Sequence, residues 1–173
     1  LLALAGSRVT QDGELLIKRG NGTRIEIQNA QELKKILLWG ERAAVLDSQG
    51  QLLVMDRRQQ GDSLPEVLST WQKLAENVLD FQITDTRFAI LDQNRNLLAK
   101  EGDFGGEWIP LATNVRAFSL ADTRLGYLTD QGELYVQTGA LKSDWLLIKN
   151  QVLAFQLVDN RIAFVDEQRN LFV

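Results

Sequence analysis

The strongest constraint on the fold is an internal repeat with a period of 37 residues. Successive copies share a leucine, and these leucines are 37, 45, 37 and 37 residues apart. The shared leucines are Leu15, Leu52, Leu97, Leu134 and Leu171. The longer interval reflects about eight extra residues within 56–68. A fixed period in this range is the signature of an array of similar supersecondary units, stacked so that neighbours bury one another's apolar faces.

Each copy contains four short segments with the properties of β-strands. In the copy at 115–151, the first expected strand is Phe118 to Leu120, and the other three begin at Arg124, Leu134 and Trp145. Apolar residues alternate with polar ones at a period of two, and β-branched and aromatic residues are frequent. The segment 28–38 has helical propensity, but the repeat aligns it with the expected strand at 152–157, so we predict a strand there.

A turn of the type Asp-x-x-Gly separates the second and third expected strands, as at 47–50. Glycine at its last position permits a positive φ in a tight hairpin. Arg95 and Arg169 replace this glycine in two copies, and we expect those two turns to be relaxed or tilted.

Four strands in each of five tandem units are compatible with a β-propeller or a closed barrel, and radial repetition favours the propeller. We predict an all-β fold, a small β-propeller of about five four-stranded blades, as a single domain over 1–173. The repeats fall approximately at 1–32, 33–77, 78–114, 115–151 and 152–173, so the last blade is incomplete. Three alternatives remain for its outer strand: residues outside this chain supply it, the blade has only three strands, or the chain is part of a longer propeller.

The composition excludes several kinds of chemistry. There is no cysteine and no histidine, which removes disulfides, thiolate metal sites and a Ser-His-Asp triad. The 23 acids show no spacing that singles out a catalytic pair or a calcium loop. The net charge of −4 and the lack of a long basic run argue against a nucleic-acid partner, and no apolar run is long enough to span a membrane. We predict a protein that is not an enzyme and has no metal or cofactor.

The motif Asp-x-Arg-Ile-x-x-Leu-Asp-x-x-Gly-x-Leu-Tyr-Val-Lys, followed by Gly and Trp, resembles the tectonin and tachylectin-2 type of β-propeller repeat over essentially the whole chain. The repeat here is shorter than that of tachylectin-2. The resemblance implies a non-enzymatic protein that binds carbohydrate, with one site per blade or pair of blades. The turn differs from the Ser-x-Asp-x-Gly box of sialidase propellers, so glycosidase activity is not implied.

A repeated Asp-x-Arg tripeptide is the first candidate binding feature. It precedes the second strand in three copies, as Asp85 to Arg87, Asp122 to Arg124 and Asp159 to Arg161. Carboxylates and guanidinium groups form charge-assisted hydrogen bonds and would suit sugar hydroxyls. The alternative is that each arginine, including Arg42 of an earlier copy, forms a structural ion pair that packs neighbouring repeats together.

Tryptophan is the second candidate feature. Trp71, Trp108 and Trp145 recur at intervals of 37 and could either stack on sugar rings or wedge between sheets. Trp39 breaks the repeat, because the residues at the equivalent positions are not aromatic. A position facing a ligand and a position without a role in binding are equally compatible with this. The polar insertion at 57–65 could carry function or be a solvated loop.

Two functional hypotheses follow. The first is lectin-like carbohydrate recognition through repeated sites whose multivalency raises affinity. The alternative is a protein–protein interaction scaffold or a targeting module of a larger, possibly secreted, protein, which the unique insertion supports. The expected partner is accordingly a carbohydrate or a protein surface, and we expect an extracellular location.

Overall fold

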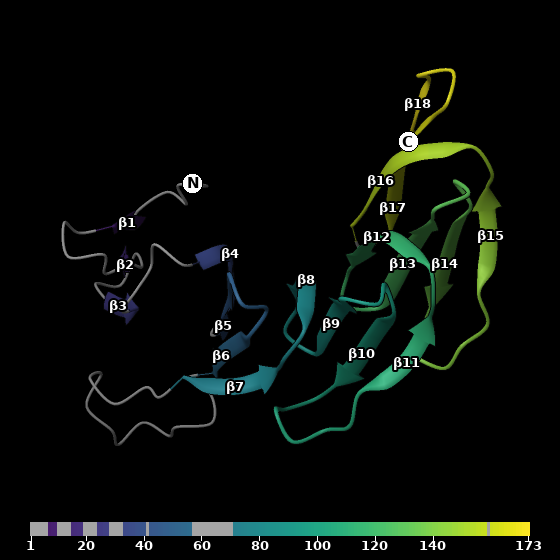
Figure 1. Cartoon of the computed structure of the whole chain (residues 1–173). Coiled ribbons are helices and arrows are strands. Elements are labelled where there is room, and N and C mark those ends of the chain that lie inside the picture. The colour runs from purple at the N-terminus through teal and green to yellow at the C-terminus, as the bar shows by residue number, and fades with distance from the viewer. Residues whose placement is uncertain are drawn as a thin grey trace. The chain divides into compact units, whose positions relative to one another are not determined.

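The structure is a computed structural model that describes residues 7–9, 15–18, 24–27, 33–40, 42–56, 71–158 and 160–173. The described residues form strands, turns and bends, and none of them is helical. By its internal contacts the chain divides into two compact units, residues 1–76 and 77–173 (Figure 1).

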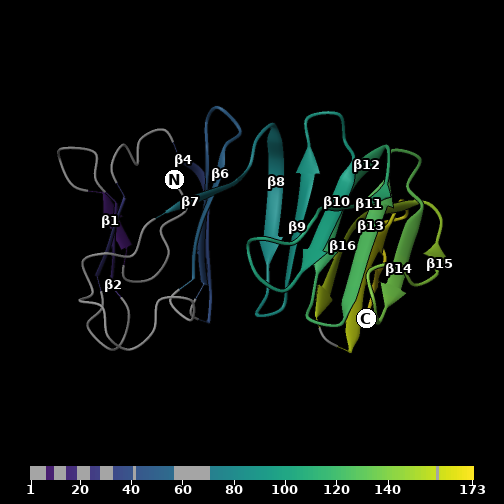
Figure 2. The ribbon, with the colours of Figure 1, turned by 90° about the horizontal axis from the view of Figure 1, so that it is seen from below.

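The second unit contains three successive antiparallel sheets in which the strands pair in chain order (Figures 1 and 2). The first sheet consists of β8 (Val78–Ile83), β9 (Arg87–Asp92), β10 (Leu97–Glu101) and β11 (Ile109–Ala112). The second consists of β12 (Val115–Leu120), β13 (Arg124–Thr129), β14 (Leu134–Thr138) and β15 (Leu146–Lys149). The third has three strands, β16 (Val152–Val158), β17 (Arg161–Asp166) and β18 (Leu171–Phe172).

The first unit contains two further sheets of the same kind. One has three strands, β1 (Ser7–Val9), β2 (Leu15–Lys18) and β3 (Arg24–Ile27). The other has four, β4 (Leu33–Trp39), β5 (Arg42–Asp47), β6 (Leu52–Asp56) and β7 (Gln72–Ala75). Strand β4 confirms that this segment is extended rather than helical: burial of its apolar residues against β5 outweighs local helix propensity.

These sheets confirm the predicted fold class. All five are open antiparallel meanders, the form of a propeller blade, and none closes on itself as a barrel. The last blade is incomplete, with three strands. The expected fourth strands begin one residue later than predicted, after the repeated tryptophan rather than at it, as at Ile109 and Leu146.

The turn between the second and third strands is built around the repeated aspartate. The carboxylate oxygen Oδ1 of Asp92 accepts hydrogen bonds from the backbone N–H groups of Asn94 and Asn96, both at 2.8 Å. Asp47 holds its turn in the same way, through the N–H groups of Gln49 and Gln51. The side chain therefore replaces a backbone acceptor and fixes the path of the turn.

The expectation that arginine would relax this turn is wrong. Arg95 and Arg169 have φ of 60° and 65°, in the same left-handed region as Gly50 and Gly132 at 83° and 80°. The N–H of Arg95 donates to the carbonyl of Asp92 at 3.0 Å, as that of Gly50 does to Asp47 at 3.3 Å. The carboxylate bonds hold the turn strongly enough that a side chain is forced into a conformation that glycine would adopt at less cost.

In each sheet of the second unit, the residue just before the first strand has a positive φ. Asn77, Asn114 and Gln151 immediately precede the first strands and have φ of 58°, 54° and 59°. The residue that follows then donates to the turn of the preceding sheet, from Val115 N–H to the Arg95 carbonyl at 3.0 Å. Val152 makes the equivalent bond to Gly132 at 2.9 Å. The turn of one sheet thus fixes the start of the next.

Consecutive sheets of the second unit pack face to face. The sheets β8–β11 and β12–β15 share one buried apolar cluster, hereafter the seam. Its buried members are Ala89, Leu91, Leu97, Ala99, Val115, Phe118, Leu120, Leu125 and Leu141. On the face of the sheet β12–β15 that lies opposite the seam, β13 approaches β16 at Gly126. A Cβ added there would lie 2.7 Å from Leu157 Cδ1 and 2.8 Å from Phe155 Cε2. The same repeat position carries Ala44, Ala89 and Ala163.

We expect Gly126→Ala to lower the free energy of unfolding by about 1–3 kcal/mol, because the new methyl group overpacks the buried Leu157. The measurement is equilibrium urea unfolding. Gly105→Ala is the matched control, because its Cβ would meet only the Asp103 carboxylate, at 3.5 Å, and we expect a change within about 0.5 kcal/mol. Equal effects of the two substitutions would contradict the close approach at Gly126.

The turn carboxylate of the last sheet links stability to pH. Desolvation acts to raise the pKa of Asp166, but hydrogen bonds from Asn170 and from the Gln168 N–H, with the charge of Lys149, outweigh it and hold this pKa below its usual value. The Asn170 N–H donates to Oδ1 at 2.9 Å. The ionised form is therefore favoured in the folded state.

We expect the stabilisation by Asp166 to be complete above about pH 4 and to be lost as the pH falls through the lowered folded-state pKa. Asp166→Asn keeps an acceptor oxygen but removes the charge. The difference in urea midpoint between wild type and this variant should therefore narrow when the pH is lowered below about 4. A difference that stays constant to pH 2 would show that the charge contributes nothing.

Candidate functional site

A groove of about 540 Å³ opens in the second unit, between β11 of one sheet and the loop that joins β14 to β15 in the next. Trp108 and Trp145, two of the predicted site residues, both line it. The aliphatic part of its wall comes from Ile109, Pro110, Leu111 and Leu141, and its polar part from Glu107, Lys142 and Ser143. The structure thus brings together equivalent tryptophans of two successive repeats.

Trp108 is held in place by a buried lysine. Lys100 is only 2% exposed, and its Nζ lies 5.2 Å from the centre of the Trp108 ring and 5.9 Å from that of Phe88. The same ammonium group donates to the carbonyl oxygens of Phe104 and Gly106, at 2.5 and 3.1 Å. Lys100 therefore fixes the loop before β11 and, through a cation–π contact, the ring that follows it.

Trp145 is held by an aromatic contact. Its ring meets Tyr127 edge-on, with centroids 4.6 Å apart and planes at 80°, and it packs on the seam. Desolvation raises the pKa of Tyr127, with further contributions from Tyr135 and Glu133, so the phenol is neutral over the physiological range. Trp108 and Trp145 are both half-buried. Each ring packs on its own sheet and also forms part of the groove wall, so packing and binding are compatible roles.

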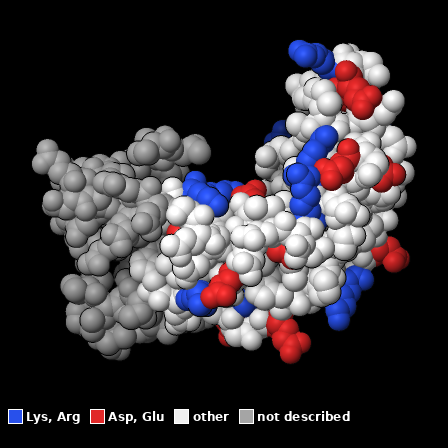
Figure 3. Space-filling model, viewed as in Figure 1, with Lys and Arg blue, Asp and Glu red and all other residues white. Residues whose placement is uncertain are grey.

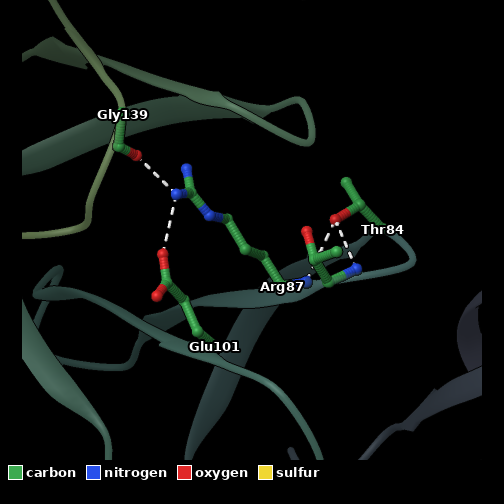
Figure 4. A network of polar contacts seen from close by, with 5 residues as sticks. Thr84, Arg87, Glu101 and Gly139 are labelled. Atoms are coloured by element: carbon green, nitrogen blue, oxygen red, sulfur yellow. Dashed lines mark hydrogen bonds and ion pairs between the residues drawn. The ribbon is translucent and has the colours of Figure 1, made fainter.

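Arg87 fixes the other wall of the groove. Its Nη2 donates to Glu101 Oε1 at 2.7 Å and to the carbonyl of Gly139, where the loop between β14 and β15 begins (Figure 4). The arginine is 6% exposed, and Thr84 Oγ1 accepts a hydrogen bond from its backbone N–H at 3.1 Å. A side chain of one sheet thus anchors the loop of the next. At Arg87 this matches the structural alternative, in which the repeated arginine packs neighbouring repeats together.

The other repeated arginines have different environments. Arg42 is buried in the first unit, Arg124 is half-buried and Arg161 is exposed. Of the aspartates, Asp85 is exposed, whereas Asp122 is half-buried and its Oδ1 is enclosed without a hydrogen bond. Asp159 lies outside the described residues. The described residues of the three tripeptides therefore differ in exposure, and the role of the tripeptides in binding remains a prediction.

The remaining tryptophans lie in the first unit. Trp71 packs on a cluster formed by Ala43, Val45 and Met55. Trp39 ends β4 and is 46% exposed, next to Gly40 with φ of 53°. The predicted loop at 57–65 lies outside the described residues. A role of Trp39 in binding therefore remains a separate prediction.

The charged residues of the groove, Glu107 and Lys142, are not among the site residues predicted from the sequence. The position of Glu107 carries Asp144 in the next copy but Thr70 in the earlier one, and Lys142 is replaced by Gly105, so periodicity does not single out this pair. Their position immediately before Trp108 and three residues before Trp145 is the signal that could have identified them.

Charged side chains of both signs are mixed on the described surface shown in Figure 3. On the face shown in Figure 3, acidic and basic side chains of the described residues are interspersed, without a continuous field of one sign. Within the described ranges, no cluster of three or more acids could hold a metal ion, and no helical segment could cross a membrane. Glu107 is the one carboxylate among the residues that line the groove, so the groove lacks the carboxylate pair of a glycosidase.

Comparison with known proteins identifies the fold. No protein-family model matches the sequence, and no curated protein matches it. Prp20p from Saccharomyces cerevisiae is structurally similar, with a TM-score of 0.66, 13% identity, and coverage of 97% of this chain and 49% of that one. Human WBSCR16 gives 0.63, 13%, 93% and 55%, and Kluyveromyces lactis Hsv2 gives 0.57, 15%, 90% and 52%.

These structures are β-propellers, and the described sheets have the arrangement of propeller blades. The chain is therefore an all-β protein of the β-propeller class. It spans about half the length of the structures it resembles. At these identities, the similarity establishes the fold alone.

We expect Arg87→Ala to destabilise the protein by about 1–3 kcal/mol, because it removes the anchor between two sheets and leaves the Gly139 carbonyl without this donor. Arg87→Lys should recover only part of the loss, since an ammonium group lacks the planar fork of the guanidinium. Arg161→Ala, at an exposed position, is the control and should change stability by less than about 0.5 kcal/mol. Thermal and urea unfolding measure all three; equal effects at the two positions would refute the anchoring role.

Proposed function

We propose that this chain is a non-enzymatic binding module whose function is protein–protein interaction, and that the groove between β11 and the β14–β15 loop is its contact site. The observation that carries the proposal is the pair of tryptophans from successive repeats on this one groove. Both rings are fixed by other side chains, Trp108 by Lys100 and Trp145 by Tyr127. A rigid aromatic pair can bind with little loss of side-chain entropy.

The chemistry of the groove fits a protein partner. Interaction hot spots are enriched in tryptophan and are surrounded by polar groups that complete the contact. Here apolar walls lie beside one acidic and one basic side chain, Glu107 and Lys142. Such a surface can bury apolar groups of a partner and also orient it through charge.

The structural neighbours support the same class of function. One structure shows yeast Prp20 bound to Kap60, and another study of Prp20p concerns its binding to Gsp1p and histones. These interactions belong to those proteins, and the inference to this chain rests on fold analogy. The analogy favours a partner-binding scaffold over a catalyst.

Carbohydrate recognition is the second candidate, and the same two tryptophans favour it. An indole face stacks on the apolar face of a sugar ring, and Glu107, Lys142 and Ser143 could contact hydroxyl groups. The repeated Asp-x-Arg turns add less support, because the guanidinium of Arg87 already contacts Glu101 and Gly139. In either case, we propose one main groove in the described part of the chain rather than equal sites on every blade.

The test is to screen the folded protein in parallel on a random-peptide display and a glycan array. Glu107→Lys with Lys142→Glu exchanges the two groove charges without altering net charge. The matched control exchanges an exposed ion pair of the first unit, Lys73→Glu with Glu76→Lys. We expect selected peptides to lose at least about tenfold in affinity with the groove variant and to retain it with the control.

If no peptide binds, and glycans bind to wild type but not to the groove variant, then carbohydrate recognition replaces protein–protein interaction as the proposed function. Binding of either kind that survives the groove exchange would remove the groove from the mechanism.

A further inference from the structure

We infer that the groove receives a proline-rich segment of a protein partner, bound as a polyproline II helix. This inference rests on the proposed function and names the kind of partner. It follows from three features: the nature of the strand at its edge, the two tryptophans, and the placement of the two charges.

The strand at the edge of the groove is poorly suited to pairing with a partner strand. β11 is the outermost strand of its sheet, and it is only four residues long, Ile109–Ala112. Its second residue is Pro110, which has no N–H to donate, and a register shift interrupts its pairing with β10. A proline on an edge strand blocks the addition of another strand. Recognition by backbone pairing is therefore disfavoured, and side chains must supply the affinity.

The tryptophans supply that affinity for a ligand with its own regular shape. Aromatic-lined grooves bind polyproline II segments, whose rings pack against the indoles and whose extended form exists before binding. Trp108 immediately precedes β11 and Trp145 immediately precedes β15, and both rings line the groove. Because neither ligand backbone nor receptor rings need ordering, a short segment suffices.

The charges predict the direction of the segment. Glu107 belongs to the β11 side of the groove and Lys142 to the β14–β15 loop. A segment that lies across the groove, from one side to the other, therefore has one end near an acidic group and the other end near a basic group. A ligand with a basic residue at one end and an acidic residue at the other can then satisfy both in one orientation only. Opposite charges placed in this way set direction more than they set overall affinity.

The experiment uses the full chain and two series of fluorescein-labelled peptides, Arg-(Pro)n-Glu and the reversed Glu-(Pro)n-Arg, with n varied. Fluorescence anisotropy measures each affinity for wild type, for the double variant Glu107→Lys with Lys142→Glu, and for the Lys73/Glu76 exchange. We expect wild type to prefer one series by about tenfold. The groove variant should reverse that preference, and the control should keep it.

Peptides in which serine replaces every proline, with the same terminal charges, test the conformation of the ligand. They should bind at least about tenfold more weakly if the polyproline II form is recognised. Trp108→Ala should abolish proline-peptide binding, whereas Trp39→Ala, at an exposed tryptophan of the first unit, should not. If Trp108→Ala fails to fold, the reversal by the charge variant still decides the question.

Equal binding of serine and proline peptides would overturn the inference and leave the proposed function intact. No binding of any peptide in these series, with display-selected peptides still held by the groove, would have the same meaning. If the groove binds glycans and no peptide, both the inference and the proposed protein partner are overturned.

Discussion

The face-to-face packing of successive sheets is the constraint on which the second unit depends. A four-stranded sheet of this length has two apolar faces, and each must be covered by a neighbour. The seam covers one face of β12–β15, while Leu157 and Phe155 cover the other at Gly126. A slip of one residue would exchange the two faces of a strand and would place a larger side chain at the close approach now occupied by Gly126. The small residue at the position of Gly126 sets how closely the sheets approach.

The groove is a consequence of how this packing ends. In the inner part of the seam, small and branched residues such as Ala89 and Leu125 fill the space between the sheets. Toward β11 and β15, the partly buried Ile109, Leu111 and Trp145 pack against the same cluster, and all three also line the groove. Two buried cations then stabilise the loops on either side, Lys100 before β11 and Arg87 after β14. A rigid scaffold that positions a few loop side chains is the usual basis of a binding site.

Much of the fold could be predicted from the sequence because the repeat encodes it locally. The spacing of leucines and arginines places the strands, and the aspartates of three turns, Asp47, Asp92 and Asp166, make bonds within four residues of themselves. The left-handed conformation of Arg95 could not be predicted in this way, because arginine carries no preference for it. The partners of Arg87 were also beyond periodicity: one lies 14 residues away and the other in the next repeat. Contacts of this kind depend on the packing of one sheet against the next, which the period of the repeat does not specify.

The similar backbones of the repeats carry different side chains, and this difference distinguishes the proposed groove from the other places where sheets meet. One repeat position in the third strand holds Met55, Lys100 and Gln137 in turn, and all three are buried. Only Lys100 places an ammonium group over a tryptophan of the groove. In the same way, the equivalent arginines range from buried Arg42 to exposed Arg161. Repetition therefore builds the scaffold, whereas the residues that depart from it distinguish one seam from the others, as expected of a module with one main contact surface rather than a ring of identical ones.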